Sequence, residues 1–158
     1  MRTILPFLVV ALVGGSALAA PTYFVMADMV RAEEGTPRGP VCVPNSVFFP
    51  GEKIVFRAGV VDAATGEQLR FDEVQARGDK AVVKFYDHDD IAMFFPPPEA
   101  GSPPGSGFFR GPWPVPQDQA AGMYNWHIEV SDAQGNSASY QPIGQSFGAN
   151  AVTIQSAP

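Results

Sequence analysis

Residues 46–61 read Ser46-Val47-Phe48-Phe49-Pro50-Gly51-Glu52-Lys53-Ile54-Val55-Phe56-Arg57-Ala58-Gly59-Val60-Val61. A short apolar run ends at Pro50-Gly51, and an alternating run follows it. The side chains that share one face of this second run belong to Ile54, Phe56, Ala58 and Val60. A period of two is typical of a half-buried β-strand. Because Pro presets φ for a turn and Gly accepts positive φ, the stretch predicts a strand that begins after a Pro-Gly corner, with structural roles for Pro50, Gly51 and Phe56.

The composition of the whole chain favours an all-β fold. Its 158 residues suit one domain with a sizeable core. The chain contains 16 Gly and 16 Pro, the two residues that are least compatible with helices. We count about seven short strands separated by turn signals, and no convincing helix. The expected architecture is therefore an immunoglobulin-like Greek-key sandwich.

Two later stretches also alternate in polarity. Residues 80–86 predict a strand with Ala81, Val83 and Phe85 on one face. Residues 122–130 predict the clearest strand of the chain, with Tyr124 and Trp126 at the start of its inner face. Tyr124 stands where a tyrosine corner fastens a Greek-key connection by a hydrogen bond back to the backbone. Between these strands, residues 68–71 are expected to form a short returning strand.

The chain divides into three expected parts. Residues 1–19 have the charged start, apolar core and Ala17-Leu18-Ala19 cleavage site of a secretory signal peptide. Residues 20–42 are expected to be an N-terminal extension or linker, and residues 43–158 the sandwich. The apolar part of the leader is shorter than the roughly 20 residues that span a bilayer, and no later segment is a candidate. A periplasmic or secreted location follows, with an uncleaved membrane anchor as the alternative.

Charge and cysteine content narrow the function classes. The formal charge of −6 and the absence of any Lys/Arg cluster argue against nucleic-acid binding, which needs a basic patch. Cys42 is the single cysteine, so no disulfide forms within the chain. Because Cys42 stands between Val41 and Val43, and because free cysteines are often buried, we expect its thiol to be buried, with exposure for metal binding or pairing between molecules as the alternative.

Several motifs together resemble the bacterial immunoglobulin-like domains of macroglobulin type. They are Phe49-Pro50-Gly51-Glu52 with the strand after it, the Gly122-Met123-Tyr124 strand start, and the Asp132-Ala133-Gln134-Gly135 turn. The resemblance covers residues 43–154 and implies the sandwich fold. Such sandwiches serve as adhesin spacers, envelope scaffolds and binding modules, so the resemblance does not select one function. No Cys-Gly-Glu-Gln thioester motif is present, so protease trapping is not implied.

One acidic run predicts a candidate metal site. Asp87-His88-Asp89-Asp90 supplies carboxylates for Ca²⁺, or an imidazole with carboxylates for Zn²⁺ or Cu²⁺. Together with His88 and these aspartates, Cys42 would give a site of mixed sulfur, nitrogen and oxygen ligands. The run lacks the spacing of a calcium loop, and a solvated turn is the alternative interpretation. No other cofactor is expected.

Aromatic residues around a proline-rich loop predict a contact surface. Pro96-Pro97-Pro98 cannot continue a strand, and aromatic residues lie on both sides of the loop, namely Phe94, Phe95, Phe108, Phe109 and Trp113. Aromatics exposed beside Pro and Gly are able to dock a partner or a glycan. The alternative is that these rings cap one end of the core.

The sequence therefore leaves three hypotheses open. The first is an exported, non-catalytic binding or scaffold domain that contacts another envelope or periplasmic protein through residues 91–116. The second is a periplasmic metal-binding accessory protein of a redox or metal-handling system. The third is a carbohydrate-binding module that uses Trp113. An enzyme is disfavoured because no nucleophile motif or Cys-x-x-Cys pair is present. The oligomeric state stays open.

Overall fold

The computed structural model describes residues 22–85, 88–101, 107–145 and 150–156. It confirms an all-β fold, with 48% of the described residues in strands and 6% in helix. The elements in chain order are β1 (Tyr23–Gly35), β2 (Val47–Phe48), β3 (Glu52–Asp62), α1 (Phe71–Arg77), β4 (Lys80–Phe85), β5 (Ile91–Met93), β6 (Phe109–Pro114), β7 (Gly122–Tyr124), β8 (Trp126–Ser131), β9 (Ser137–Tyr140) and β10 (Val152–Ile154).

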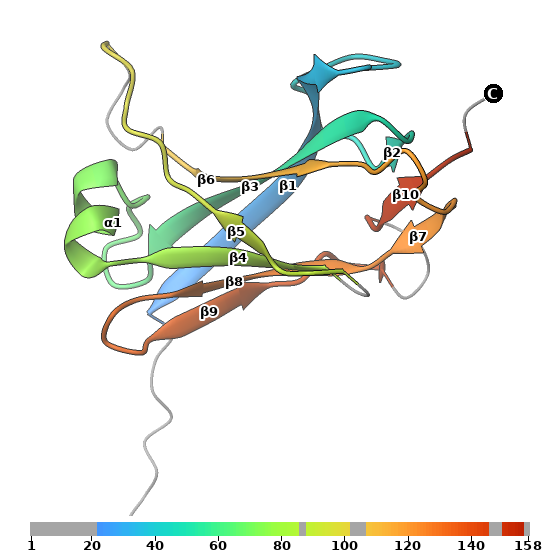
Figure 1. Ribbon diagram of the computed structural model, residues 1–158. Helices are drawn as coiled ribbons and strands as arrows, with labels where there is room; N and C mark the ends of the chain where they lie inside the picture. Colours follow the sequence, from blue (N-terminus) through green and yellow to red (C-terminus); the bar gives the residue numbers. More distant parts are fainter. Residues whose placement is uncertain (1–21, 86–87, 102–106, 146–149, 157–158) are drawn as a thin grey trace, which may run out of the picture.

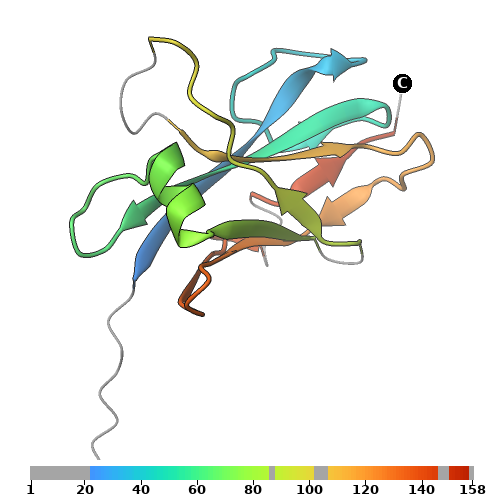
Figure 2. The ribbon, with the colours of Figure 1, turned by 60° about the vertical axis from the view of Figure 1, so that its left-hand side comes forward.

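The strands form three sheets. Two of them, with strand orders β1-β3-β6 and β5-β4-β8-β9, are antiparallel and lie in two layers (Figure 1). The third, β2-β10-β7, lies at one end of the layers, and α1 lies at the other end (Figures 1 and 2). A backbone bridge between Phe94 and Arg110 connects the two large sheets along one side, and β1 contacts β9 along the other. The two layers are therefore nearly closed around the core.

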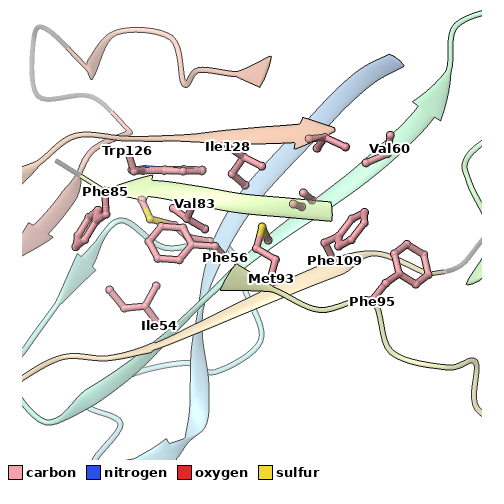
Figure 3. Packing of buried hydrophobic residues seen from close by; sticks show 14 of the residues in the cluster. Ile54, Phe56, Val60, Val83, Phe85, Met93, Phe95, Phe109, Trp126 and Ile128 are labelled. Atoms are coloured by element: carbon pink, nitrogen blue, oxygen red, sulfur yellow. The ribbon is translucent and has the colours of Figure 1, made fainter. Parts of the chain in front are cut away.

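The core lies between the two large sheets, as the alternation in β3 predicts. Ile54, Phe56, Ala58 and Val60 are all buried there. The Phe56 ring lies 5.9 Å from the Phe85 ring of β4 and 5.1 Å from the Trp126 ring of β8 (Figure 3). Burying a large side chain stabilises a fold by roughly 1.5–3 kcal/mol, so this aromatic centre is a main source of stability.

The Pro50-Gly51 corner forms as predicted, although the strands on its two sides belong to different sheets. Gly51 has a φ of 83°, and the amide of Glu52 donates to the carbonyl of Phe49 at 3.1 Å to close the turn. β3 enters the β1-β3-β6 sheet, whereas β2 pairs in parallel with β10. The corner therefore carries the chain from the small sheet into a large one.

A buried ion pair holds this corner. Arg31 Nε donates to Glu52 Oε1 at 2.9 Å, and both side chains are almost fully buried. Glu52 also accepts hydrogen bonds from the amides of Arg38 and Phe49, and Arg31 donates to the carbonyl of Val47. Burying two charges is tolerated when hydrogen bonds satisfy both groups, as they do here. The pair thus connects β1, the loop after it and the start of β3.

The structure corrects the interpretation of residues 20–42 as a linker. Residues 23–35 form β1, which pairs with β3 from Tyr23↔Asp62 to Gly35↔Glu52, with an irregularity between Arg31 and Gly35. Most of the expected linker is therefore a long strand of a large sheet. The polar residues from Arg31 onward made the segment look like an exposed connector. In the structure, however, Arg31 is buried by its ion pair with Glu52.

A helix follows the segment that was expected to form a short strand, of which only Gln68 pairs with another strand residue, Val61. Residues 68–71 lead into α1, whose one buried residue is Val74, so the helix has too short an apolar stripe to be recognised by periodicity. Its ends do carry the usual signals: Asp72 and Glu73 lie in the first turn, and Gly78 adopts a φ of 68° at the C-terminal cap. The expectation of no helix was wrong.

The predicted roles of Tyr124 and Trp126 are confirmed in part. The Tyr124 hydroxyl donates to the carbonyl of Ala120 at 2.7 Å, which is the backward hydrogen bond expected of a tyrosine corner. Trp126 is buried, and its indole donates to the carbonyl of Asn150 at 3.0 Å. The single strand predicted over residues 122–130 is divided at Asn125, so that Tyr124 belongs to the small sheet and Trp126 to a large one.

The proposed leader, residues 1–19, lies outside the described residues. Within the described part of the chain, no helix has both the length and the apolar character needed to cross a membrane.

Candidate functional site

The two Phe-Phe pairs around the proline-rich loop are each divided between the core and the surface. Phe95 and Phe109 are buried, and their rings meet edge to face at 5.0 Å (Figure 3). Phe94 is 52% exposed, and Phe108 is half-buried. Successive side chains of extended backbone point to opposite faces, which explains the division. Of the predicted contact surface, Phe94 and Phe108 therefore remain available, whereas Phe95 and Phe109 are core residues.

The Trp113 side chain is not fully exposed either. It lies on β6 opposite Ile54, and its ring packs edge to face on the Phe85 ring at 4.6 Å. The His88 ring lies 5.3 Å from it and stacks on Phe85 at 4.8 Å. Trp113 thus belongs to a half-buried aromatic cluster with Phe85 and His88.

Phe94 belongs to a row of side chains that crosses β6, β3 and β1. The strand register places Asp28 opposite Arg57, Arg57 opposite Arg110, and Arg110 opposite Phe94. Residues opposite one another on antiparallel strands project from the same face. Because Phe56 and Phe109 project into the core, this row projects from the other side of the sheet. We call this side the outer face of β1–β3–β6.

Two arginines of this row lie against one aromatic ring. Arg57 and Arg110 are centred 5.7 and 4.9 Å from the Phe108 ring. Arg57 Nε donates to Asp28 Oδ1 at 2.7 Å, and this bidentate pair raises the pKa of the Arg57 guanidinium. Arg110 has no acidic partner within the described residues, and its buried Nε lacks a hydrogen-bond acceptor there. One cation is therefore neutralised, and its neighbour is not.

A groove of about 530 Å³ hollows the outer face beside these side chains. Its lining combines an apolar row across three strands, Val30, Val55 and Pro112, with Arg57, Arg110 and the two phenylalanines. A second hollow of about 290 Å³ begins on the other side of Phe108 and reaches Met26. The groove offers apolar surface next to a guanidinium, a combination suited to recognising another molecule.

Cys42 lines this groove, and the expectation that it is buried was wrong. Its amide donates to the carbonyl of Arg31, and Asn45 donates to Met29, so residues 42–45 run along the outer edge of β1 rather than through the core. Cys42 itself has a φ of 58°. Its position at an edge leaves the thiol exposed between two apolar neighbours, which residue type alone does not predict.

The predicted metal ligands lie in different places. Asp87 is outside the described residues. Asp90 accepts a hydrogen bond from Lys84 at 2.6 Å, and Asp89 is exposed. His88 packs in the aromatic cluster, whereas Cys42 lines the groove on the outer face of β1–β3–β6. Among the described residues, no group of three His, Cys, Asp or Glu side chains is placed so that it could hold a metal ion.

A second polar cluster lies at the end of the molecule near α1. The Tyr23 hydroxyl donates to Asp132 Oδ2 at 2.7 Å and lies 3.3 Å from Asp79 Oδ1. Asp79 is only 8% exposed, and burial raises the pKa of its carboxyl. Hydrogen bonds from Asn136 lower the pKa of Asp132 to about 2, and burial raises the pKa of Tyr23 to about 12. The cluster fastens the start of β1 to the turn between β8 and β9.

Comparison with protein-family models, with curated proteins and with solved structures finds no match to this chain. The candidate site is therefore assigned from its own geometry. Sequence reasoning found Phe94 and Phe108 but missed the two arginines. Arg57 falls on the polar side of the alternating run and Arg110 directly follows Phe108-Phe109, yet only the strand register shows that they are neighbours.

Proposed function

We propose that this protein is an exported, non-catalytic binding or scaffold domain that contacts another envelope protein through the outer face of β1–β3–β6. The observation that carries the proposal is the apolar character of this face. Phe24, Met26 and Phe94 are 55%, 57% and 52% exposed. Large apolar side chains that are exposed on one face of a protein are typical of interaction sites, because leaving them in water is unfavourable.

The finer fold assignment is part of the same proposal. We take the two large sheets as an immunoglobulin-like Greek-key sandwich of macroglobulin type. The Pro50-Gly51 corner, the hydrogen bond from Tyr124 back to Ala120, and the core between two antiparallel sheets support this assignment. Such a frame suits a scaffold or binding role, since function on these folds lies in surface sites rather than in the frame itself.

The groove has the rigidity that a binding surface needs. The buried Arg31–Glu52 pair holds β1 to β3 at one end of it. The bidentate contact between Arg57 and Asp28 fixes one arginine across the same two strands. A surface held in place before binding loses less conformational entropy when a partner docks. Binding by the outer face therefore requires no rearrangement of the sheet.

The single cysteine provides a test of the proposal. A photo-cross-linker attached to Cys42 places the reactive group on the groove. Irradiation in the periplasmic or secreted fraction of the source organism is expected to give one main cross-linked protein, to be identified by mass spectrometry. The purified protein so identified should then bind the unlabelled chain with defined stoichiometry.

Two variants control this experiment. The double variant Phe94→Ser with Phe108→Ser removes the exposed aromatics of the groove and should abolish the cross-link. Ile143→Ser removes an equally apolar side chain, 88% exposed, that does not line the groove, and should leave the cross-link unchanged. Equal cross-linking by all three proteins would contradict the proposal.

A further inference from the structure

Arg110 differs from the other cations of the groove. Lys53 pairs with Glu34, Arg57 pairs with Asp28, and Arg31 is buried against Glu52. Arg110 has no such partner among the described residues, and the Phe108 ring is its main contact. A guanidinium presents five donors in a planar fork that matches a carboxylate. Among the described residues, the groove therefore contains one strong donor group without an acidic acceptor.

The cross-strand neighbour of Arg110 is a second arginine. Arg57 lies directly opposite Arg110, and like charges in opposite positions destabilise a sheet. Asp28 compensates one of the two charges, because it accepts from Arg57 on the far side of the row. A second carboxylate beside Arg110 would give each arginine of the row its own acidic partner. The structure supplies no such carboxylate from its own described residues.

The apolar part of the groove lies at a defined distance from Arg110. Val55 is two residues from Arg57, and Pro112 is two residues from Arg110, so both lie about 6.6 Å along the strands from the charged row. An extended peptide repeats its side chains with the same two-residue spacing. Glu33 also lines the groove, but it follows Val30 on β1 and so lies on the far side of the apolar row from Arg110.

We propose that the groove binds an extended segment of the partner protein in which an acidic residue and an apolar residue are two positions apart. The carboxylate accepts hydrogen bonds from Arg110, and the apolar side chain lies on Val55 and Pro112 beside Phe94. This inference rests on the proposed function and adds the chemistry of the partner.

Charge also distinguishes this occupant from a second copy of the chain. A symmetric dimer through the outer face would bring the uncompensated arginines of two copies to the same interface, where like charges are unfavourable. An acidic segment instead supplies the missing countercharge. Sedimentation of the unlabelled protein tests this directly: a dimer that Phe94→Ser dissociates would overturn the proposal.

Synthetic peptides test the recognition itself. The probes are acetylated, amidated hexapeptides in a Gly/Ser background that carry Glu and Leu two positions apart, Gln and Leu two positions apart, or Glu and Leu adjacent. A fourth peptide has no acidic side chain but a free C-terminal carboxylate two positions after Leu. Titration of the ¹⁵N-labelled protein, followed by amide shifts of the outer face, gives each dissociation constant. The second and third peptides isolate the charge and the spacing, and the fourth distinguishes a terminal carboxylate from a side chain.

The first peptide should bind at least about tenfold more tightly than its Gln counterpart, because a hydrogen bond to a charged group is worth that much. Arg110→Gln should bring this ratio close to one. Lys84→Gln, on the other large sheet, is the matched control and should leave the ratio unchanged. Equal affinity for the Glu and Gln peptides, or a preference that survives Arg110→Gln, would overturn the inference.

Failure of this inference is distinguishable from failure of the proposed function. If a partner cross-links from Cys42 but the peptides show no charge preference, the outer face binds by apolar contact alone and the assignment of an acidic segment is wrong. If no peptide shifts the outer face and no cross-link depends on Phe94 and Phe108, both proposals are wrong.

Discussion

The outer surfaces of the two large sheets differ although both face water. On β4 and β8 the outward side chains are mostly polar and paired: Lys84 contacts Asp90 and Glu129, and His127 contacts Glu129. On β1–β3–β6 the outward side chains include exposed Phe24, Met26 and Phe94. An antiparallel sheet with one solvated face is expected to be polar on that face. Only the β1–β3–β6 sheet departs from this rule, and its apolar outer face is therefore the candidate binding surface.

The largest difference in stability is expected between substitutions on the two faces of the β1–β3–β6 sheet. Phe109→Ala removes a buried ring and should lower the free energy of unfolding by about 3–5 kcal/mol. Phe108→Ala, one residue earlier but on the outer face, should lower it by about 1 kcal/mol or less, since it removes a half-buried ring and two cation–π contacts. Urea denaturation of both variants measures the difference. Equal losses would mean that Phe108 is a core residue and not part of a binding surface.

The second largest effect concerns ion pairs: loss of the buried pair between β1 and β3 should destabilise the fold more than loss of the exposed pairs on the other large sheet. Glu52→Gln leaves the Arg31 guanidinium buried without its countercharge and should lower the free energy of unfolding by about 3–5 kcal/mol. Lys84→Ala breaks exposed ion pairs on the other sheet and should change it by about 1 kcal/mol or less. Thermal unfolding of the two variants at neutral pH checks this ranking. A Glu52→Gln variant as stable as the parent would contradict the role of the pair in holding the groove.

A smaller, pH-dependent effect concerns the two aspartates that meet Tyr23. The raised pKa of Asp79 means that its protonated form is favoured in the folded state, so any stability it contributes is present at low pH and lost as pH rises through its folded pKa. Asp79→Asn should therefore raise the melting temperature at pH 7 and have little effect near pH 3.

Asp132 should behave in the opposite way. Its pKa is lowered to about 2, so its contribution is present above its usual pKa and lost as pH falls toward 2. Asp132→Asn should lower the melting temperature at pH 7, and the loss should disappear on acidification. Melting curves of both variants between pH 2 and 8 measure the two trends, and parallel profiles for the two variants would contradict the assignment.

The smallest expected effect on stability is that of Arg110→Gln. This change removes a like-charge contact with Arg57 and a cation–π contact with Phe108, two effects of opposite sign, so it should change the free energy of unfolding by about 0.5 kcal/mol or less. Urea denaturation at low salt, where charge repulsion is least screened, measures it. A larger decrease in the free energy of unfolding would show that Arg110 stabilises the sheet and is not kept free to bind a ligand.

The part of the fold that could be predicted from sequence is the part governed by simple alternation. The inner face of β3 around Phe56 and the inner residues of β4 and β8 follow the period of two and are buried as predicted. β1 was missed because the burial of Arg31 depends on Glu52, a residue distant in sequence. α1 was missed because a helix with one buried side chain has little amphipathic pattern.

The candidate site could be predicted only in part for a similar physical reason. Phe94 and Phe108 were identified by residue type, but Phe95 and Phe109 were grouped with them because alternation was not extended through the proline-rich loop. The exposure of Cys42 depends on how residues 42–45 run along β1, and the neighbouring positions of Arg57 and Arg110 depend on strand register. Neither arrangement is local in sequence, so neither has a local signal.

The most direct test of the binding surface is a cross-linking comparison between the two large sheets. One protein carries the photo-cross-linker on Cys42, beside the groove, and the other carries it on the outer face of β8 after Cys42→Ser and Glu129→Cys. We predict that the label on Cys42 captures one partner protein and that the label on β8 does not capture it. Equal capture from both positions, or capture from β8 alone, would contradict the assignment of function to the outer face of β1–β3–β6.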